Sequence, residues 1–153
     1  MEKLPEFEGP YRLLCARKKK VKVFLSPCGK HFHVKAEMKD DVHHMRLTMR
    51  VQNPSFKISD IACDMPGVPD AYCREALDCL KPFIDRRVAP GLTRGVQVPA
   101  QKGCTHLLNL FREACDNLLV SQSVIGREYY TRIFPHISEE QLYHMFLADV
   151  VAK

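Results

Sequence analysis

Alternating apolar and polar residues mark the first half of the chain as β-strands. Every second residue is apolar along residues 31–38, and the same period of two recurs along residues 43–51. Shorter apolar runs at 11–17, 21–25 and 56–63 bring the expected number of strands to four or five. Short turns rich in Pro, Gly, Asp and Asn separate these runs, so we expect an antiparallel meander with one buried face.

The hydrophobic period changes to that of a helix from about residue 70. One helical face there carries Cys73, Ala76, Leu77 and Leu80. A second apolar stripe runs from Cys104 to Leu118, which predicts a helix ending near Ser121. The sequence SEEQ at 138–141 has the form of a capping box and predicts the start of a last helix.

Strands first and helices afterwards predict an α+β fold. We expect a meander sheet of four to five strands, followed by two to three helices packed on one of its faces. At 153 residues the chain has the length of one domain, 1–153, with the sheet at about 11–63 and the helices at about 70–150. A connection of nearly twenty residues, 85–102, precedes the second helix and is long enough to cover or build a site.

Composition and charge narrow the class of protein. Hydrophobic residues make up 46% of the chain, and no apolar run approaches the roughly 20 residues that span a bilayer. The N-terminus lacks the pattern of a secretory signal, and seven cysteines then indicate a reducing compartment, so we expect a cytoplasmic protein.

The net charge of +5 is concentrated in residues 17–22, which favours a solvated hairpin or edge strand. The chain has no Trp, and its basic and aromatic residues do not interleave, so the sequence argues against a protein that binds nucleic acid.

Three cysteines and one histidine form the candidate site. Cys73 and Cys104 each fall near the start of a predicted helix, where unpaired N–H groups favour thiolate over thiol. Cys63 ends the last predicted strand, and His106 lies two residues beyond Cys104. These four residues would meet where the strand ends and the helices start. Thiolates with one imidazole suit zinc or an iron–sulfur cluster.

Two alternatives compete with a metal site. A cysteine on an apolar stripe is often a small core residue, and no C-x-x-C pair occurs in the chain. Cys104 could instead be a nucleophile, although positions i and i+2 of a helix face about 200° apart, so His106 suits it as a base only if Cys104 lies in the helix cap. His43 or His44 would be a better placed base, and residues 85–102 could roof the pocket.

Residues 80–118 resemble a family of small bacterial domains of unknown function that carries a Gly-Cys-Thr-His-Leu motif. The motif stands complete here at residues 103–107, and a Pro-Gly-x-Thr-Arg element matches residues 90–94. The resemblance implies no activity. A more distant likeness is to iron–sulfur cluster assembly scaffolds, which place ligand cysteines after the strands and at helix starts, as Cys63, Cys73 and Cys104 stand here. The scaffolds have a histidine or lysine just before the last cysteine, where this chain has Gly103.

Our leading hypothesis from the sequence is a nonenzymatic accessory protein that binds zinc or an iron–sulfur cluster. Its ligands would be Cys63, Cys73, Cys104 and His106, and a protein partner would receive or supply the metal or cluster. The first alternative is a small thiol-dependent enzyme or ligand-binding domain that uses Cys104. The second is a structural interaction module without a site.

Overall fold

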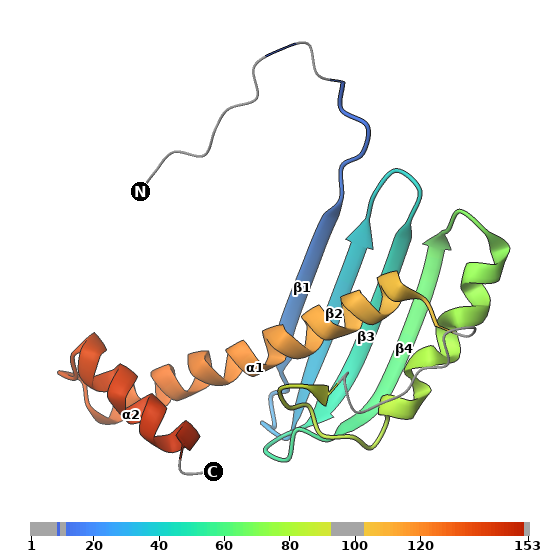
Figure 1. Ribbon diagram of the computed structural model, residues 1–153. Coiled ribbons are helices and arrows are strands. Elements are labelled where there is room, and N and C mark those ends of the chain that lie inside the picture. Colours follow the sequence, from blue (N-terminus) through green and yellow to red (C-terminus); the bar gives the residue numbers. More distant parts are fainter. Residues whose placement is uncertain (1–8, 10–11, 93–102, 152–153) are drawn as a thin grey trace.

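The computed structural model describes residues 9, 12–92 and 103–151 (Figure 1). Four strands come first, namely β1 (Lys18–Leu25), β2 (His31–Lys39), β3 (His44–Gln52) and β4 (Ile58–Gly67). The 3₁₀ helix η1 (Ala71–Phe83) and the helices α1 (Thr105–Ile133) and α2 (Glu139–Val151) follow. The predicted α+β fold is confirmed. No helix in the described part of the chain is long and apolar enough to cross a membrane.

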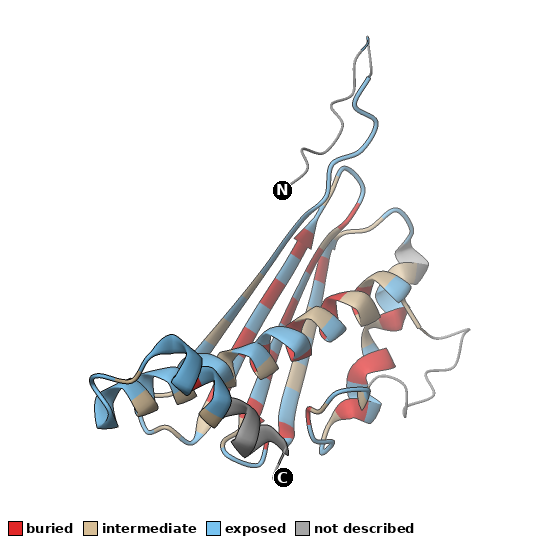
Figure 2. Cartoon of the chain, turned by 60° about the vertical axis from the view of Figure 1, so that its left-hand side comes forward, coloured by how far each residue is buried: buried red, intermediate tan, exposed pale blue. Residues whose placement is uncertain are grey.

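The four strands form one antiparallel sheet in the order β1-β2-β3-β4. Each residue pairs across the strands with a partner on the same face, so the period of two in the sequence sorts side chains into two layers. Figure 2 shows this sorting as alternating buried and exposed bands along the strands. Buried residues lie on the face that α1 covers, which we call the inner face, and exposed residues lie on the opposite, open face.

Helix α1 closes the core by crossing the inner face diagonally (Figure 1). Its buried residues are Leu107, Leu110, Phe111, Ala114, Cys115 and Leu118. Phe111 is fully buried, and its ring lies 4.5 Å from that of Phe83 in η1, centroid to centroid. Lys19 of β1 forms an ion pair with Glu113 of α1 at the margin of this contact. Apolar burial between one helix and one sheet face therefore holds the layers together.

The elements differ from the predicted ones at three points. The first strand begins at Lys18, and the described part of residues 11–17 is not a strand, which makes the basic run the edge strand β1. Residues 71–83 form a 3₁₀ helix that contains Pro82, although their spacing predicted an α-helix. Helix α1 continues to Ile133 because no proline interrupts it after its buried stripe ends at Leu118.

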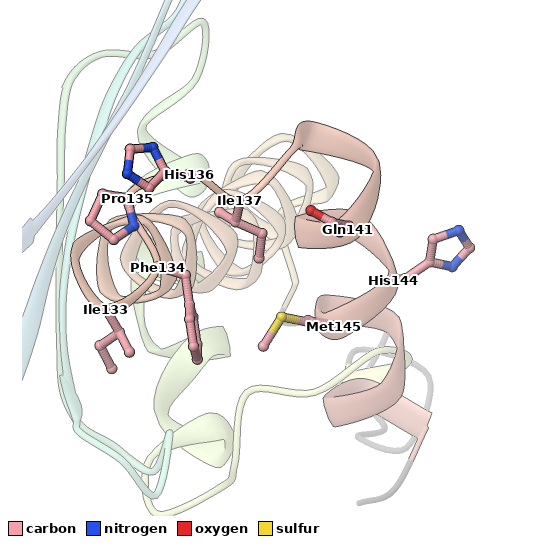
Figure 3. Close-up of a pocket in the computed structure, with 8 residues that line it drawn as sticks. All are labelled: Ile133, Phe134, Pro135, His136, Ile137, Gln141, His144 and Met145. Atoms are coloured by element: carbon pink, nitrogen blue, oxygen red, sulfur yellow. The ribbon is translucent and has the colours of Figure 1, made fainter.

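The part of α1 after its last buried residue, Leu118, and the helix α2 form an extension beyond the sheet. The predicted capping box is present: the Gln141 N–H donates to Ser138 Oγ at 3.2 Å, and the Ser138 N–H donates to Gln141 Oε1 at 3.0 Å. An apolar cleft of about 660 Å³ opens between the end of α1 and α2 (Figure 3). Ile137 and Met145 point into this cleft, whereas His144 projects away from it. The cleft lies outside the core under the sheet.

We predict that truncating Phe111 destabilises the fold far more than the same change in the extension. Phe111→Ala should lower the free energy of unfolding by about 3–5 kcal/mol, because it leaves a cavity in the core. Phe134→Ala is the matched control, since Phe134 is 47% exposed, and should cost about 1 kcal/mol or less. Urea unfolding followed by circular dichroism measures both. Equal losses would contradict the view that the sheet and the start of α1 form the core.

Candidate functional site

The start of α1 places Cys104 in the helix cap. Cys104 is the N-cap residue, its backbone is extended with φ −106° and ψ 115°, and its side chain makes no capping hydrogen bond. Its carbonyl accepts the Leu108 N–H at 2.9 Å, the first hydrogen bond of the helix. The thiol therefore lies beside the unpaired N–H groups of the first turn. The 200° separation expected for two helical residues does not apply to Cys104 and His106, because Cys104 is in the cap.

His106 of α1 packs against His43, which directly precedes β3. The two imidazole rings lie 4.4 Å apart, centroid to centroid, with their planes tilted by 48°. His43 is buried at 9% exposure, and its Nδ1 lies 3.0 Å from Oδ1 of Asp40 in the turn between β2 and β3. We call these residues the Asp40–His43–His106 cluster. It joins the β2–β3 turn to the start of α1, two segments more than 60 positions apart in the chain.

Asp40 is held as a buried carboxylate. Its side chain is fully shielded from solvent, and it accepts hydrogen bonds from the N–H groups of Val42 at 3.0 Å and His43 at 2.6 Å. Arg17 donates through Nε at 2.8 Å. Burial alone would raise the pKa of Asp40, but these donors outweigh it and hold that pKa well below its usual range. An ionised carboxylate only accepts hydrogen bonds, so His43 carries a proton on Nδ1.

The Nδ1 proton fixes the chemistry of the other ring nitrogen. With the Nδ1 proton donated to Asp40, Nε2 is the ring nitrogen of His43 that is left to accept a proton. Burial lowers the pKa of His106, and electrostatic repulsion from His43 and Arg17 lowers it further. His106 is therefore neutral near pH 7. The cluster combines one oriented imidazole with a second imidazole that resists protonation.

The thiol of Cys79 lies near two of the predicted ligands, Cys63 and Cys104. Burial raises the pKa of Cys63 to about 12, and the neighbouring thiol of Cys79 adds to the rise. Burial raises the pKa of Cys79 too, although a backbone hydrogen bond from Cys104 opposes this. Cys79 thus interacts with both Cys63 and Cys104. All seven cysteines are free, and the raised pKa values keep Cys63 and Cys79 protonated at neutral pH.

The predicted ligands do not form one close group in the described structure. Cys63 and Cys104 both neighbour Cys79, Cys73 is half-buried in η1, and His106 contacts the imidazole of His43. Among the residues that the structure describes, no three His, Cys, Asp or Glu side chains are grouped so as to hold a metal ion. The four-residue ligand set stays a prediction.

Sequence reasoning missed Asp40 and Cys79 as members of the site. Neither was among the candidate residues, since Asp40 lies in a turn and Cys79 is buried on the apolar side of η1. A signal for Asp40 was present, because an aspartate three residues before a histidine in a turn can cap the backbone and reach the ring. No local pattern marks Arg17, which reaches Asp40 from a segment 23 positions earlier.

The long connection before α1 lines a hollow, but not next to Cys104. Residues 89–92 face Arg112, Cys115 and Asp116 across a hollow of about 330 Å³. Cys115 is 11 positions beyond Cys104, which corresponds to about 16 Å along a helix. Residues 93–102 of the predicted roof lie outside the described residues.

Comparison with known proteins identifies the family. The model of a protein family described as "Protein of unknown function (DUF2889)" matches residues 24–119. The chain belongs to the DUF2889 family. No match was found among curated proteins or among solved structures.

The DUF2889 match ends where the helix leaves the sheet. It runs from the end of β1 to Leu119, one residue after the last buried residue of α1. Asp40, His43, Cys104 and His106 all lie within the match, whereas Arg17 and the helical extension lie outside it. The cluster therefore belongs to the DUF2889 domain itself.

We predict that His106 makes the stability of the DUF2889 domain depend on pH. In the unfolded chain a histidine titrates near its ordinary pKa of about 6.5, whereas the folded site lowers the pKa of His106. As the pH falls through 6.5, the unfolded state takes up a proton that the folded state resists, so stability is lost on the acid side. His106→Gln should lose less stability than the wild type between pH 7.5 and 5.5 in urea unfolding. His136→Gln, at an exposed histidine, should keep the wild-type loss. An unchanged pH dependence in His106→Gln would contradict the prediction.

Proposed function

We propose that this DUF2889 domain is a small thiol-dependent enzyme that binds an electrophilic small molecule at the start of α1. The observation that carries the proposal is the hydrogen bond of 3.0 Å from His43 Nδ1 to the buried Asp40, with His106 packed on the same ring. A buried carboxylate that orients an imidazole beside a second imidazole is the arrangement of acid–base sites. Cys104, two residues before His106, supplies the nucleophile.

The groups have complementary roles in such a reaction. The imidazole pair accepts the proton of Cys104, and the resulting thiolate donates an electron pair to an electrophilic carbon of the ligand and forms a C–S bond. The bond from that carbon to its leaving atom breaks, and the imidazolium gives its proton to the leaving atom. Water then attacks the same carbon and gives a proton to the imidazole pair, the C–S bond breaks, and the proton returns to the Cys104 sulfur. The unpaired N–H groups of the first turn of α1 stabilise negative charge next to Cys104. Asp40 stabilises the positive charge that forms on His43, because the carboxylate is already ionised and hydrogen-bonded.

We predict that His43 activates Cys104 towards alkylation. Iodoacetamide labelling at pH 7.5, with each cysteine followed by peptide mass spectrometry, should be roughly tenfold or more slower at Cys104 in His43→Gln than in the wild type. Cys28 provides an internal reference, because it is exposed and a hydrogen bond from Ser26 lowers its pKa independently of the site.

A neighbouring histidine supplies the matched control for this experiment. His44 is next to His43 but bonds Glu37 on the open face, with Nε2 2.7 Å from Oε1. His44→Gln should leave the rate at Cys104 unchanged. Equal rates in His43→Gln and the wild type, or equal slowing in both variants, would show that the imidazole cluster does not activate the thiol.

The position of Cys79 near Cys63 and Cys104 supports a second candidate, the accessory protein that binds zinc or an iron–sulfur cluster. Thiolates are the preferred ligands of both. Binding would have to displace the protons that the raised pKa values of Cys63 and Cys79 retain. It would also need a further ligand to approach, since the described residues hold no group of three.

Metal analysis of anaerobically purified protein, with an absorption spectrum, tests this second candidate. It predicts stoichiometric zinc or iron that is lost in Cys104→Ser and retained in Cys28→Ser, in which an exposed thiol is removed instead. Wild-type protein without stoichiometric metal would rule the candidate out.

A further inference from the structure

The open face of the sheet gathers positive charge that is scattered along the sequence. It presents Lys20 and Lys22 of β1, Lys35 of β2, and Arg46 and Arg50 of β3, all exposed. The register places Lys22 directly opposite Lys35, and it pairs Lys20 with Glu37. The acidic residues Asp60 and Asp64 both lie on β4, at the far edge of the sheet. The three strands β1 to β3 therefore form a basic surface with Glu37 as its acidic member.

Much of this positive charge is not neutralised within the chain. Glu37 bonds His44, and Asp64 pairs with Arg46. Across the described residues, Lys22, Lys35 and Arg50 have no ion-pair partner within 4.0 Å. The lysines, Arg46, Glu37 and Thr48 surround a shallow hollow of about 250 Å³. The rim carries three lysines, one arginine and one hydroxyl against the single carboxylate of Glu37, which suits an oxyanion such as phosphate.

Two rings lie beside the basic surface on the same face. Phe24 is 46% exposed, and the strand register places it opposite His33. Lys22 and Lys35 form the next pair on that face, about 7 Å further along the strands. Flat rings next to cations allow bases to stack while phosphates are bound.

We propose that the open face of this domain binds single-stranded nucleic acid. The rows of cations complement the repeated charges of a phosphodiester chain, and the Phe24–His33 pair provides a stacking platform that an acidic peptide would not use. An open sheet also accepts an extended strand without any change in fold. A lipid surface fits less well, because Phe24 is the one large apolar side chain that the described residues present among these cations.

The strand pairing interleaves basic and aromatic residues, which the linear sequence does not. The sequence argued against nucleic acid because basic and aromatic residues do not interleave along the chain. Across the sheet they do, since β1 and β2 align Phe24 and His33 beside Lys22 and Lys35. The face is also separate from the Asp40–His43–His106 cluster, because His106 belongs to α1, which covers the other side of the sheet (Figure 1). A result that contradicts one of the two proposals therefore does not contradict the other.

Fluorescence anisotropy with a fluorescein-labelled 20-nucleotide oligo-dT tests the proposal on the full chain. Replacing Lys20, Lys22 and Lys35 by Gln should weaken binding at least tenfold at 100 mM KCl. The slope of log affinity against log salt should fall by about 2, because each phosphate that the variant no longer neutralises lowers it by roughly 0.7. A control variant with Gln at Lys30, Lys57 and Lys81 removes the same charge from residues outside these strands and should change affinity less than about twofold.

A substitution of Phe24 tests the stacking platform separately from the lysines. Phe24→Leu keeps an apolar side chain but removes the ring, and it should weaken oligo-dT binding by about fivefold or more. A duplex of the same length should bind more weakly than the single strand, because its bases are not free to stack. Circular dichroism and urea unfolding establish that each variant is folded.

Three results would overturn the proposal. The first is no measurable binding of oligo-dT by the wild type at 50 mM KCl. The second is an equal loss of affinity in the open-face and control triple variants, which would show that net charge alone matters. The third is cosedimentation with vesicles of 70% phosphatidylcholine and 30% phosphatidylglycerol in the absence of oligonucleotide binding, which would identify a lipid surface as the ligand.

Discussion

The packing of α1 on one face of the meander is the constraint on which the rest of the structure depends. Four strands with a strict period of two present one apolar layer, and the first four turns of α1 cover that layer. This contact fixes the position of the start of the helix over the end of the sheet where β3 begins. His106 consequently meets His43, and Cys104 meets Cys79. The same contact leaves the other face of the sheet without a helix.

The sequence was most informative where periodicity and burial agree. The alternation along β2 and β3 matches the observed layers, and the SEEQ box marks the start of α2. The end of α1 could not be predicted from its apolar stripe, because helix formation continues after burial stops. The site was predicted only in part. Cys104 and His106 belong to the proposed site, but the partner of His106 is determined by how a turn meets a helix, which no local spacing records.

The two faces of the sheet differ in how they handle charge. On the inner side, three kinds of donor compensate for the burial of Asp40, and Lys19 is paired with Glu113 at the margin of the helix contact. On the open side, cations remain exposed and only some are paired. A sheet with one covered face thus gives the two proposed sites different electrostatic environments. One depends on restricting protonation, and the other depends on leaving charge accessible to a ligand.

The position of β1 at the edge of the sheet has a consequence for self-association. An edge strand exposes backbone N–H and C=O groups that could pair with the edge of another molecule. Lys18, Lys19 and Lys20 stand in succession on this edge, with Arg17 just before them. A second copy aligned edge to edge would bring two such rows within about 5 Å of each other. Their mutual repulsion opposes the growth of a continuous sheet and so protects the protein against aggregation through β1.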